Sequence, residues 1–320
     1  MKKPERIFLF LLPLLFTACL FFSSCSSGGA VKAEEYYSLG MAYYDMGKFD
    51  EAEKWLNRAS AAKRTMTASE YQLGRIAYEA GRYADAVRHF ERVLSKDPEN
   101  IMALKAAAYA RIKNGDLAKA EALYDRVLAL VPESADDGFN YALVLYGLKK
   151  YDRCEDTLNR YPQALEETPA SLLLLARAQK ARNRVEAIDS YAKWLAANTG
   201  TANPQGLYEY AQVLESADHY ARALEQYKAA ITALASDTEN LKKSQLLFER
   251  ARLLLTADPE NSEGITELKT AVTEGFSASA EIEDLMRDDR VSQENRDEIR
   301  KILDELLNKK EPGLPSNEEE

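Results

Sequence analysis

The chain has 320 residues, a formal net charge of −10 and 46% hydrophobic residues, which is enough apolar material for one or two folded domains. The acidic balance argues against binding to nucleic acid and against electrostatic adhesion to an anionic lipid surface. Ala, Leu, Glu, Lys and Arg dominate, and period-two alternation is nearly absent, so the composition predicts an all-α fold.

The first 25 residues have the pattern of a secretory signal. Lys2, Lys3 and Arg6 form a basic start, and residues 7–22 are almost wholly apolar. This apolar run is short for a stable membrane-spanning helix, and a proline interrupts it. A plain signal peptide or an uncleaved anchor is the alternative interpretation.

Two cysteines at the end of this segment resemble the lipid acceptor of bacterial lipoproteins, which carries diacylglycerol on its thiol and a further acyl chain, such as palmitate, on its amine. Cleavage before Cys19 would leave residues 20–22, which are apolar, on the mature end. Cys25 instead precedes a polar Ser-Ser-Gly-Gly segment. We therefore predict that 1–25 is a lipoprotein signal ending at acceptor Cys25, with Cys19 as the alternative, and that 26–32 is a flexible tether.

After the tether the sequence repeats with a period of 34 residues. The clearest unit, 67–100, reads as two amphipathic helices joined by a turn at Gly81. Gly74 and Ala86 are small where the two helices must approach closely, and Phe90 is large where the next pair must be filled. Such a unit leaves an apolar edge open, so stacked neighbours are needed to bury it.

The unit recurs in register, as shown by its small second-helix position, which holds Ala52, Ala86, Ala120 and Cys154. Repeats are predicted over 33–66, 67–100, 101–134, 135–168, 168–201 and 204–237, with an irregular helical pair at 240–277. The fourth repeat is degenerate. The fifth is shifted by about one residue, and Val185 is expected to substitute for the apolar residue that Arg184 replaces.

Two further helices are predicted over 278–308. The last has one apolar side, as expected of a cap on an open stack, formed by Ile299, Ile302, Leu303, Leu306 and Leu307. Residues 309–320 combine Pro, Gly and Ser with a run of Glu and are predicted to be disordered.

The repeated pattern of Leu-Gly, Tyr, Ala, Phe or Tyr, and Pro resembles the tetratricopeptide repeat family. The resemblance implies a right-handed α-solenoid of helical hairpins over 33–277, closed by C-terminal capping helices. In that family the first helices of the repeats line a concave groove. The positions that point into it are Tyr37, Met41, Tyr44, Tyr71, Arg75, Tyr78, Lys105, Tyr109, Phe139 and Tyr146.

A ladder of tyrosines offers broad apolar area with a hydrogen-bonding tip at little entropic cost, which suits recognition of a protein or peptide. The alternative is that a tight superhelix, or the chain's own termini, already buries these rings. No catalytic, metal or cofactor site is predicted. His89 and His219 are the only histidines. The repeat geometry is expected to expose both, and each is interpreted as a satisfied or solvated side chain rather than a catalytic one. Cys154 is interpreted as a small apolar core residue.

These features predict a non-enzymatic, lipid-anchored scaffold or adaptor that binds protein partners on the periplasmic side of a bacterial envelope membrane. Ser26, in place of an Asp after the acceptor, favours the outer membrane. The alternative is a ligand-binding or transport accessory protein with a pocket inside the superhelix. Association between copies of the chain is also left open.

Overall fold

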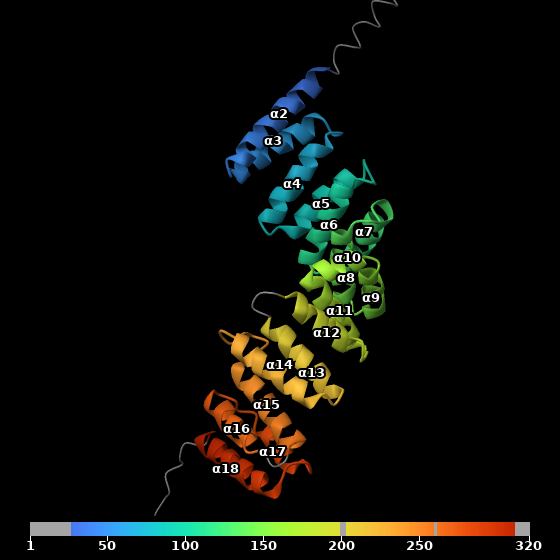
Figure 1. Cartoon of the computed structure of the whole chain (residues 1–320). Coiled ribbons are helices and arrows are strands. Elements are labelled where there is room, and N and C mark those ends of the chain that lie inside the picture. The colour runs from blue at the N-terminus through green and yellow to red at the C-terminus, as the bar shows by residue number, and fades with distance from the viewer. Residues whose placement is uncertain (1–26, 199–202, 259–260, 311–320) are drawn as a thin grey trace, which may run out of the picture. The chain divides into compact units, whose positions relative to one another are not determined.

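The computed structural model describes residues 27–198, 203–258 and 261–310, and every regular element in these ranges is an α-helix (Figure 1). The predicted all-α fold is confirmed. No helix in the same ranges is long and apolar enough to cross a membrane. The predicted signal, both candidate acceptor cysteines (Cys19 and Cys25) and residues 311–320 of the predicted tail lie outside the described residues.

The chain divides into an N-terminal unit, Met1–Lys150, and a C-terminal unit, Tyr151–Glu320. In the N-terminal unit, α2 packs on α3, α4 on α5 and α6 on α7, and each hairpin also packs on the next helix along the chain. The helices are α2 (Ser27–Asp45), α3 (Phe49–Ala62), α4 (Thr67–Glu79), α5 (Tyr83–Leu94), α6 (Ile101–Lys113), α7 (Leu117–Leu130) and α8 (Ala135–Gly147).

The C-terminal unit continues the hairpin pattern with three further pairs, α11 with α12, α13 with α14, and α15 with α16. Its helices are α9 (Tyr151–Asn159), α10 (Pro162–Glu167), α11 (Pro169–Ala181), α12 (Ala187–Ala197), α13 (Pro204–Ser216), α14 (Tyr220–Ala233), α15 (Lys243–Ala257), α16 (Glu263–Thr273), α17 (Ser279–Arg287) and α18 (Gln293–Lys310). The unit boundary falls inside the segment predicted as the fourth repeat, and α10 is a short helix that the repeat pattern did not predict.

Helix α2 begins at Ser27, so most of the segment predicted to be a flexible tether is helical. Gly28 and Gly29 are poor helix formers, which is why the composition suggested a loop. Ala33, however, is fully buried and fixes the first core-facing position of α2. Extending a helix backward from a fixed turn adds one hydrogen bond per residue, and no proline stops it.

The turns inside the hairpins preserve the 34-residue period. Six of them contain one residue in the left-handed backbone region, and these residues are Gly47, Gly81, Gly115, Lys149 and Asn183, followed by Asp218 one residue out of step. Glycine adopts this conformation without a steric penalty, whereas Lys and Asp do so at a cost. The same turn geometry therefore persists where the sequence no longer supplies glycine.

The fifth hairpin departs from the prediction just after its turn. Helix α12 begins at Ala187, later than the second helices of the earlier repeats, so Val185 remains in the turn and is 71% exposed. The expectation that Val185 fills the apolar position left by Arg184 is therefore wrong. Ala187 and Tyr191 are fully buried instead, one residue early, as the shifted register predicted.

The small positions of the second helices are buried, as predicted. Ala52, Ala86, Ala120 and Cys154 are all fully buried. At the end of the chain, the apolar side of α18 joins α15 and α16 in one core cluster that contains Ile299, Ile302, Leu303 and Leu306. Leu307, predicted to share this side, is 41% exposed, because it lies just beyond the edge that the cluster covers.

Candidate functional site

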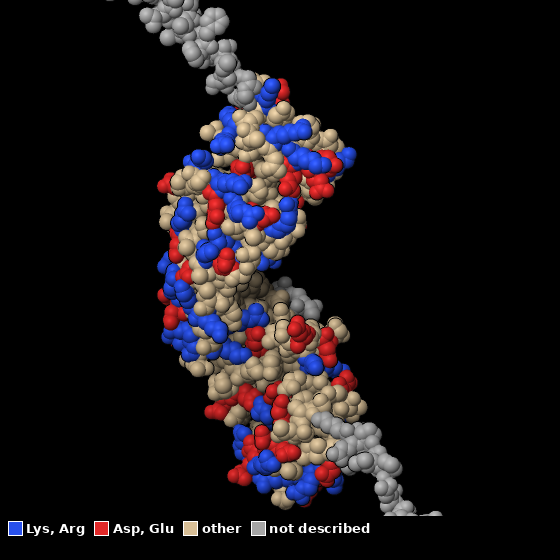
Figure 2. All heavy atoms as spheres, turned by 180° about the vertical axis from the view of Figure 1, so that it is seen from behind, with Lys and Arg blue, Asp and Glu red and all other residues tan. Residues whose placement is uncertain are grey.

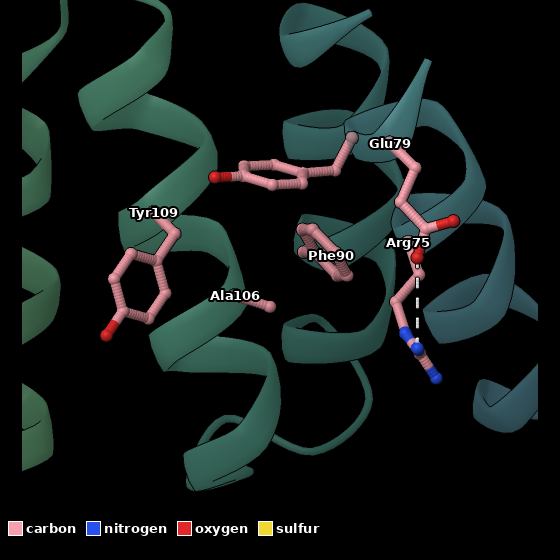
Figure 3. Close-up of a pocket in the computed structure, with 6 residues that line it drawn as sticks. Arg75, Glu79, Phe90, Ala106 and Tyr109 are labelled. Atoms are coloured by element: carbon pink, nitrogen blue, oxygen red, sulfur yellow. Dashed lines mark ion pairs between the residues drawn. The ribbon is translucent and has the colours of Figure 1, made fainter. Parts of the chain in front are cut away.

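Side chains from α4, α5 and α6 line a solvent-open hollow of about 340 Å³ in the N-terminal unit (Figure 3). We call it the Phe90 hollow. It is lined by Arg75, Tyr78, Glu79, Phe90, Ala106 and Tyr109. Most of its lining is apolar or aromatic, and its polar groups are one arginine, one carboxylate and two phenol hydroxyls.

The hollow exists because three helices contribute side chains of very different size. Arg75, Tyr78 and Glu79 lie on one side of α4, since residues three and four apart share a helix face. Phe90 of α5 is only 1% exposed and closes the inner end. Ala106 of α6 lies between Phe90 and Tyr109 in Figure 3, and its methyl group is too small to fill the hollow that these residues line with Tyr78.

The charged rim of the hollow is held by a contact from the preceding hairpin. Arg75 and Glu79 form an ion pair, with 3.8 Å between Nη2 and Oε1. The hydroxyl of Tyr44, on α2, donates to Glu79 Oε1 at 2.7 Å and accepts from Arg75 Nη2 at 2.8 Å. The Arg75 guanidinium also lies over the Tyr44 ring, 5.1 Å from its centroid. The rim is therefore ordered before any partner binds.

A second hollow of about 320 Å³ adjoins the start of α4 and is lined in part by Tyr71 and Met102. Met102 is 62% exposed. The Tyr71 ring packs on the Phe90 ring, with 5.6 Å between centroids. Phe90 thus contacts the lining of both hollows.

The structure brings four of the predicted groove residues together, namely Tyr44, Arg75, Tyr78 and Tyr109. The others are placed differently. Tyr37, Met41, Phe139 and Tyr146 are half-buried on α2 and α8. Lys105 is bound by the buried Asp137, with Nζ–Oδ1 at 2.7 Å, so its charge is compensated within the chain.

Two residues of the hollow were missed by the sequence analysis. Phe90 was interpreted only as a core residue, and Ala106 was not singled out. The signal that could have located the hollow is the small residue at position 106 between two groove tyrosines one repeat apart, because a gap in side-chain volume on a stacked surface leaves a concavity.

The expectation that His89 is exposed is wrong. Its side chain is 17% exposed, and Nδ1 donates to Glu70 Oε2 at 2.8 Å, while His219 is exposed as expected. Hydrogen bonds from His89, and also from Ser60 and Arg92, lower the pKa of Glu70 to about 2 despite its partial burial. This cluster joins α3, α4 and α5.

The remaining inventory of reactive groups is small. Among the described residues, no group of three or more His, Cys, Asp or Glu side chains is placed to hold a metal ion. Burial raises the pKa of the Cys154 thiol to about 12. On the face drawn in Figure 2, acidic and basic side chains are interspersed rather than gathered into one broad field of a single sign.

Models of the tetratricopeptide repeat match residues 33–64 and 71–135. Residues 33–64 and 71–135 are therefore tetratricopeptide repeats. A model described as anaphase-promoting complex, cyclosome, subunit 3 also matches residues 113–193. The fold is accordingly a repeat scaffold suited to binding protein or peptide partners.

Among curated proteins, an uncharacterized lipoprotein of Treponema pallidum is 26% identical over 181 residues, which cover 57% of this chain and 91% of that protein. Cellulose synthase operon protein C of Pseudomonas fluorescens is 29% identical over 126 residues, which cover 37% of this chain but only 10% of that much longer protein.

Among solved structures, a tetratricopeptide repeat protein from Parabacteroides merdae superposes with a TM-score of 0.54 at 20% identity, covering 85% of this chain and 98% of that one. A structure described as the functional characterization of Pseudomonas aeruginosa pilF superposes with a TM-score of 0.51 at 18% identity. The match covers 75% of this chain and 97% of that one. At these identities the likeness shows the fold alone.

Proposed function

We propose that this repeat protein is an adaptor that holds a segment of a partner protein across α2, α4 and α6 of the N-terminal unit, with one apolar side chain of that segment seated in the Phe90 hollow. The observation that carries the proposal is the hollow itself, with an inner end closed by Phe90 and two tyrosine walls. Its volume of about 340 Å³ is ample for a Leu, Met or Phe side chain.

The hollow has the two components that peptide recognition requires. Burying an apolar side chain between Tyr78 and Tyr109 removes apolar surface from water, worth about 1.5–3 kcal/mol for a fully buried side chain. Arg75 and Glu79 then offer a donor and an acceptor to the partner's backbone. Because Tyr44 already orients both rim groups, little side-chain entropy is lost on binding.

A photo-crosslinking amino acid placed at Tyr109 tests the site in cells. It should capture a specific partner, and capture should fall when Tyr78→Ala enlarges the hollow and removes one wall. The same crosslinker at Tyr36, which does not line the hollow and whose ring packs against Trp55 of α3 with 5.7 Å between centroids, is the matched control and should not capture that partner. Equal capture from both positions, or capture unaffected by Tyr78→Ala, would sink the assignment.

We further propose that the chain is anchored by lipid at Cys25, or alternatively Cys19, and acts on the periplasmic side of a bacterial envelope membrane, with the outer membrane favoured. The support is the signal pattern of residues 1–25 together with the Treponema pallidum relative described as a lipoprotein. Two or more acyl chains give firm membrane attachment, whereas a single chain is marginal.

The intact mass of the protein extracted from membranes decides this second proposal. Acylation at Cys25 predicts a mature chain that begins at residue 25 and carries added lipid mass, which Cys25→Ser abolishes and Cys19→Ser leaves unchanged. A mass that corresponds to the whole chain, or to a cleaved chain without lipid, would contradict the anchor.

A further inference from the structure

The C-terminal unit contains a second kind of hollow, polar on one side and apolar on the other. It lies at the ends of α11 and α13 and has a volume of about 470 Å³. We call it the Lys180 hollow. Lys180, Arg184 and Gln212 contribute polar groups to its lining, and Val185, Ile188 and Val213 contribute an apolar wall.

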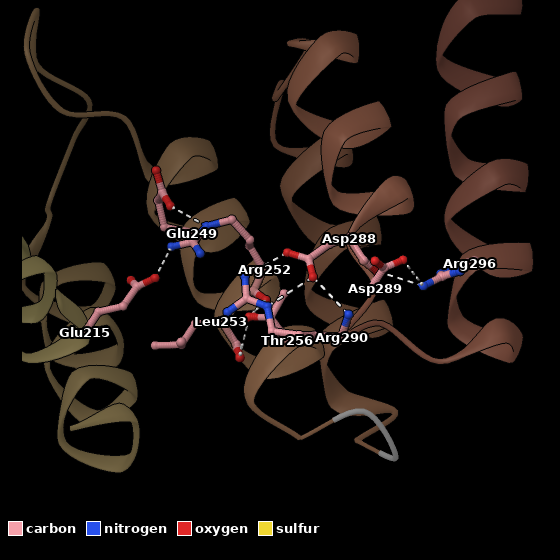
Figure 4. A network of polar contacts seen from close by, with 9 residues as sticks. All are labelled: Glu215, Glu249, Arg252, Leu253, Thr256, Asp288, Asp289, Arg290 and Arg296. Atoms are coloured by element: carbon pink, nitrogen blue, oxygen red, sulfur yellow. Dashed lines mark hydrogen bonds and ion pairs between the residues drawn. The ribbon is translucent and has the colours of Figure 1, made fainter. Parts of the chain in front are cut away.

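Lys180 differs from its charged neighbours in having no acidic partner. Its Nζ donates to the amide oxygen of Gln212 at 2.6 Å, and among the described residues no carboxylate forms an ion pair with it. Other partly buried cations of this unit are paired. Arg252, for example, binds Glu215 at 2.6 Å and Glu249 at 3.0 Å (Figure 4).

Glu209 is the carboxylate whose charge acts on Lys180, but its oxygens are already hydrogen-bonded to other residues. Glu209 accepts from Arg177 Nε at 2.7 Å and Nη2 at 3.3 Å, and from Gln205 and Tyr191 as well. Burial lowers the pKa of Lys180, which shows that its surroundings disfavour the charge. Partly buried cations are ordinarily paired, so an uncompensated ammonium facing a hollow indicates a position for an external anion.

Arg184 offers a second cationic contact in the same hollow. Its one ion pair is between Nε and Glu186 Oε2 at 3.4 Å, and both side chains are substantially exposed, so solvent competes with this pair. The terminal guanidinium nitrogens are the ones best able to contact a ligand. The apolar wall beside these cations includes Val185, which is 71% exposed at the turn before α12.

We propose that the Lys180 hollow binds a carboxylate carried on a short apolar group, with Lys180 and Arg184 contacting the carboxylate and Val185, Ile188 and Val213 contacting the apolar group. Gln212 orients the ammonium. A carboxylate suits the site better than a phosphate because the apolar wall accommodates a hydrocarbon chain, while one ammonium with one partly engaged guanidinium matches a single negative charge. The Lys180 hollow shares no lining residue with the Phe90 hollow.

The lysines are reductively methylated with ¹³C, which preserves their charge, and their NMR signals are followed during titration of the full chain. Pentanoate should shift the Lys180 signal saturably, and pentanamide should not. Two further titrations test whether the carboxylate can be the C-terminus of a polypeptide rather than that of a small acid. A peptide ending in Gly-Val with a free carboxyl terminus tests a chain end, and its C-terminal amide is the matched control.

Lys180→Met lacks the Lys180 signal, so its affinity for pentanoate is measured by isothermal titration calorimetry beside the wild type. It should be weaker roughly tenfold or more, the effect expected from losing one charge-assisted hydrogen bond. Lys193→Met, which removes an exposed lysine of α12, should leave binding unchanged. If Lys180→Met does not fold, Lys180→Arg serves to assign the signal, and the wild-type titration still decides the question. No saturable shift with pentanoate, an equal response to pentanamide, tighter binding of inorganic phosphate, or equal losses in both lysine variants would each overturn the proposal.

Discussion

Gly74 faces the ring of Phe90 so closely that a β-carbon added to Gly74 would lie 2.6 Å from Phe90 Cε1. Gly74 is on α4 and Phe90 is on α5, the two helices of one hairpin. The Phe90 ring packs against Gly74 and also lines the Phe90 hollow. A similar close approach occurs between neighbouring hairpins of the C-terminal unit, where a β-carbon on Gly206 of α13 would lie 2.6 Å from Trp194 Cη2 of α12. A missing side chain on one helix makes room for a large ring on the other.

Gly74→Ala should therefore destabilise the protein, although alanine is the better helix former by about 1 kcal/mol. Overpacking of a filled core costs about 1–3 kcal/mol, and Phe90 is too enclosed to move away. We expect a net loss near 1 kcal/mol by chemical denaturation. Adding Phe90→Leu to Gly74→Ala should remove the clash, so the pair should be less destabilised than the sum of the two single variants. A stabilising effect of Gly74→Ala alone would contradict the packing.

Lys149→Gly should stabilise the protein. Lys149 has φ of 59° at the turn position that holds glycine in the first three hairpins. The left-handed conformation costs about 1–2 kcal/mol for a residue with a β-carbon, partly offset by the greater freedom of glycine in the unfolded chain. A gain of about 0.5–1 kcal/mol in the free energy of unfolding is expected. Gly115→Lys, the reverse change one repeat earlier, should lower the free energy of unfolding by a similar amount. If both variants changed the free energy of unfolding in the same direction, the turn geometry would be refuted.

Glu70→Gln should reduce stability at neutral pH and flatten the dependence of stability on pH in acid. The pKa of Glu70 is lowered from 4.5 to about 2 in the folded protein. Its contribution is therefore fully present above about pH 4.5 and is lost as the pH falls through about 2. After allowance for solvent screening of this partly exposed group, we expect about 1–2 kcal/mol.

The measurement for Glu70 is the free energy of unfolding in urea at several pH values between 2 and 7. Glu99→Gln, which neutralises an exposed carboxylate in the turn after α5, is the matched control and should preserve the wild-type slope. A slope unchanged by Glu70→Gln would show that the cluster with His89, Ser60 and Arg92 does not act in solution.

Arg252→Met should destabilise the C-terminal unit by about 2–3 kcal/mol, because it leaves two partly buried carboxylates without their cation. Arg252 on α15 binds Glu215 on α13, and Tyr227 on α14 donates to the other oxygen of the same carboxylate at 2.9 Å. The contact therefore joins three helices. Adding Glu215→Gln should recover part of the loss. Strict additivity of the two substitutions would mean that the ion pair contributes nothing.

Cys154 should not react with a thiol reagent in the native protein. Its side chain is fully buried, and a pKa raised to about 12 leaves almost no thiolate at neutral pH. In a variant with Cys19 and Cys25 changed to Ser, modification should appear only as urea unfolds the C-terminal unit. Rapid modification in buffer would contradict the burial of this helix crossing.

The repeat architecture was predictable because its physical causes are local. Ala52, Ala86, Ala120 and Cys154 recur at a spacing of 34 residues, and each is fully buried on the second helix of its repeat. Turn glycines mark the breaks, and aromatic residues such as Phe90 and Tyr124 mark the filled positions between hairpins. In a stack where each repeat packs mainly on its neighbours, short-range size and periodicity are enough to specify the fold.

The positions of the candidate binding surfaces depend on side-chain contacts between helices, which the 34-residue periodicity does not predict. Tyr109 and Tyr78 were expected in a groove, but the hollow between them depends on Ala106 and on Phe90 from another helix. Lys105 occupied an equally suitable groove position, yet Asp137 neutralises it. Lys180 drew no attention in the sequence, and it is left uncompensated because Arg177 binds Glu209.

The sequence by itself determined the helices, their pairing and the small and large positions of the core, since those follow from side-chain volume at fixed spacing. Only the tertiary structure decided which polar groups satisfy one another and where volume is missing. That outcome is a competition among side chains about 30 residues apart along the chain, as between Arg177 and Lys180 near Glu209, and distance and geometry settle it rather than residue type.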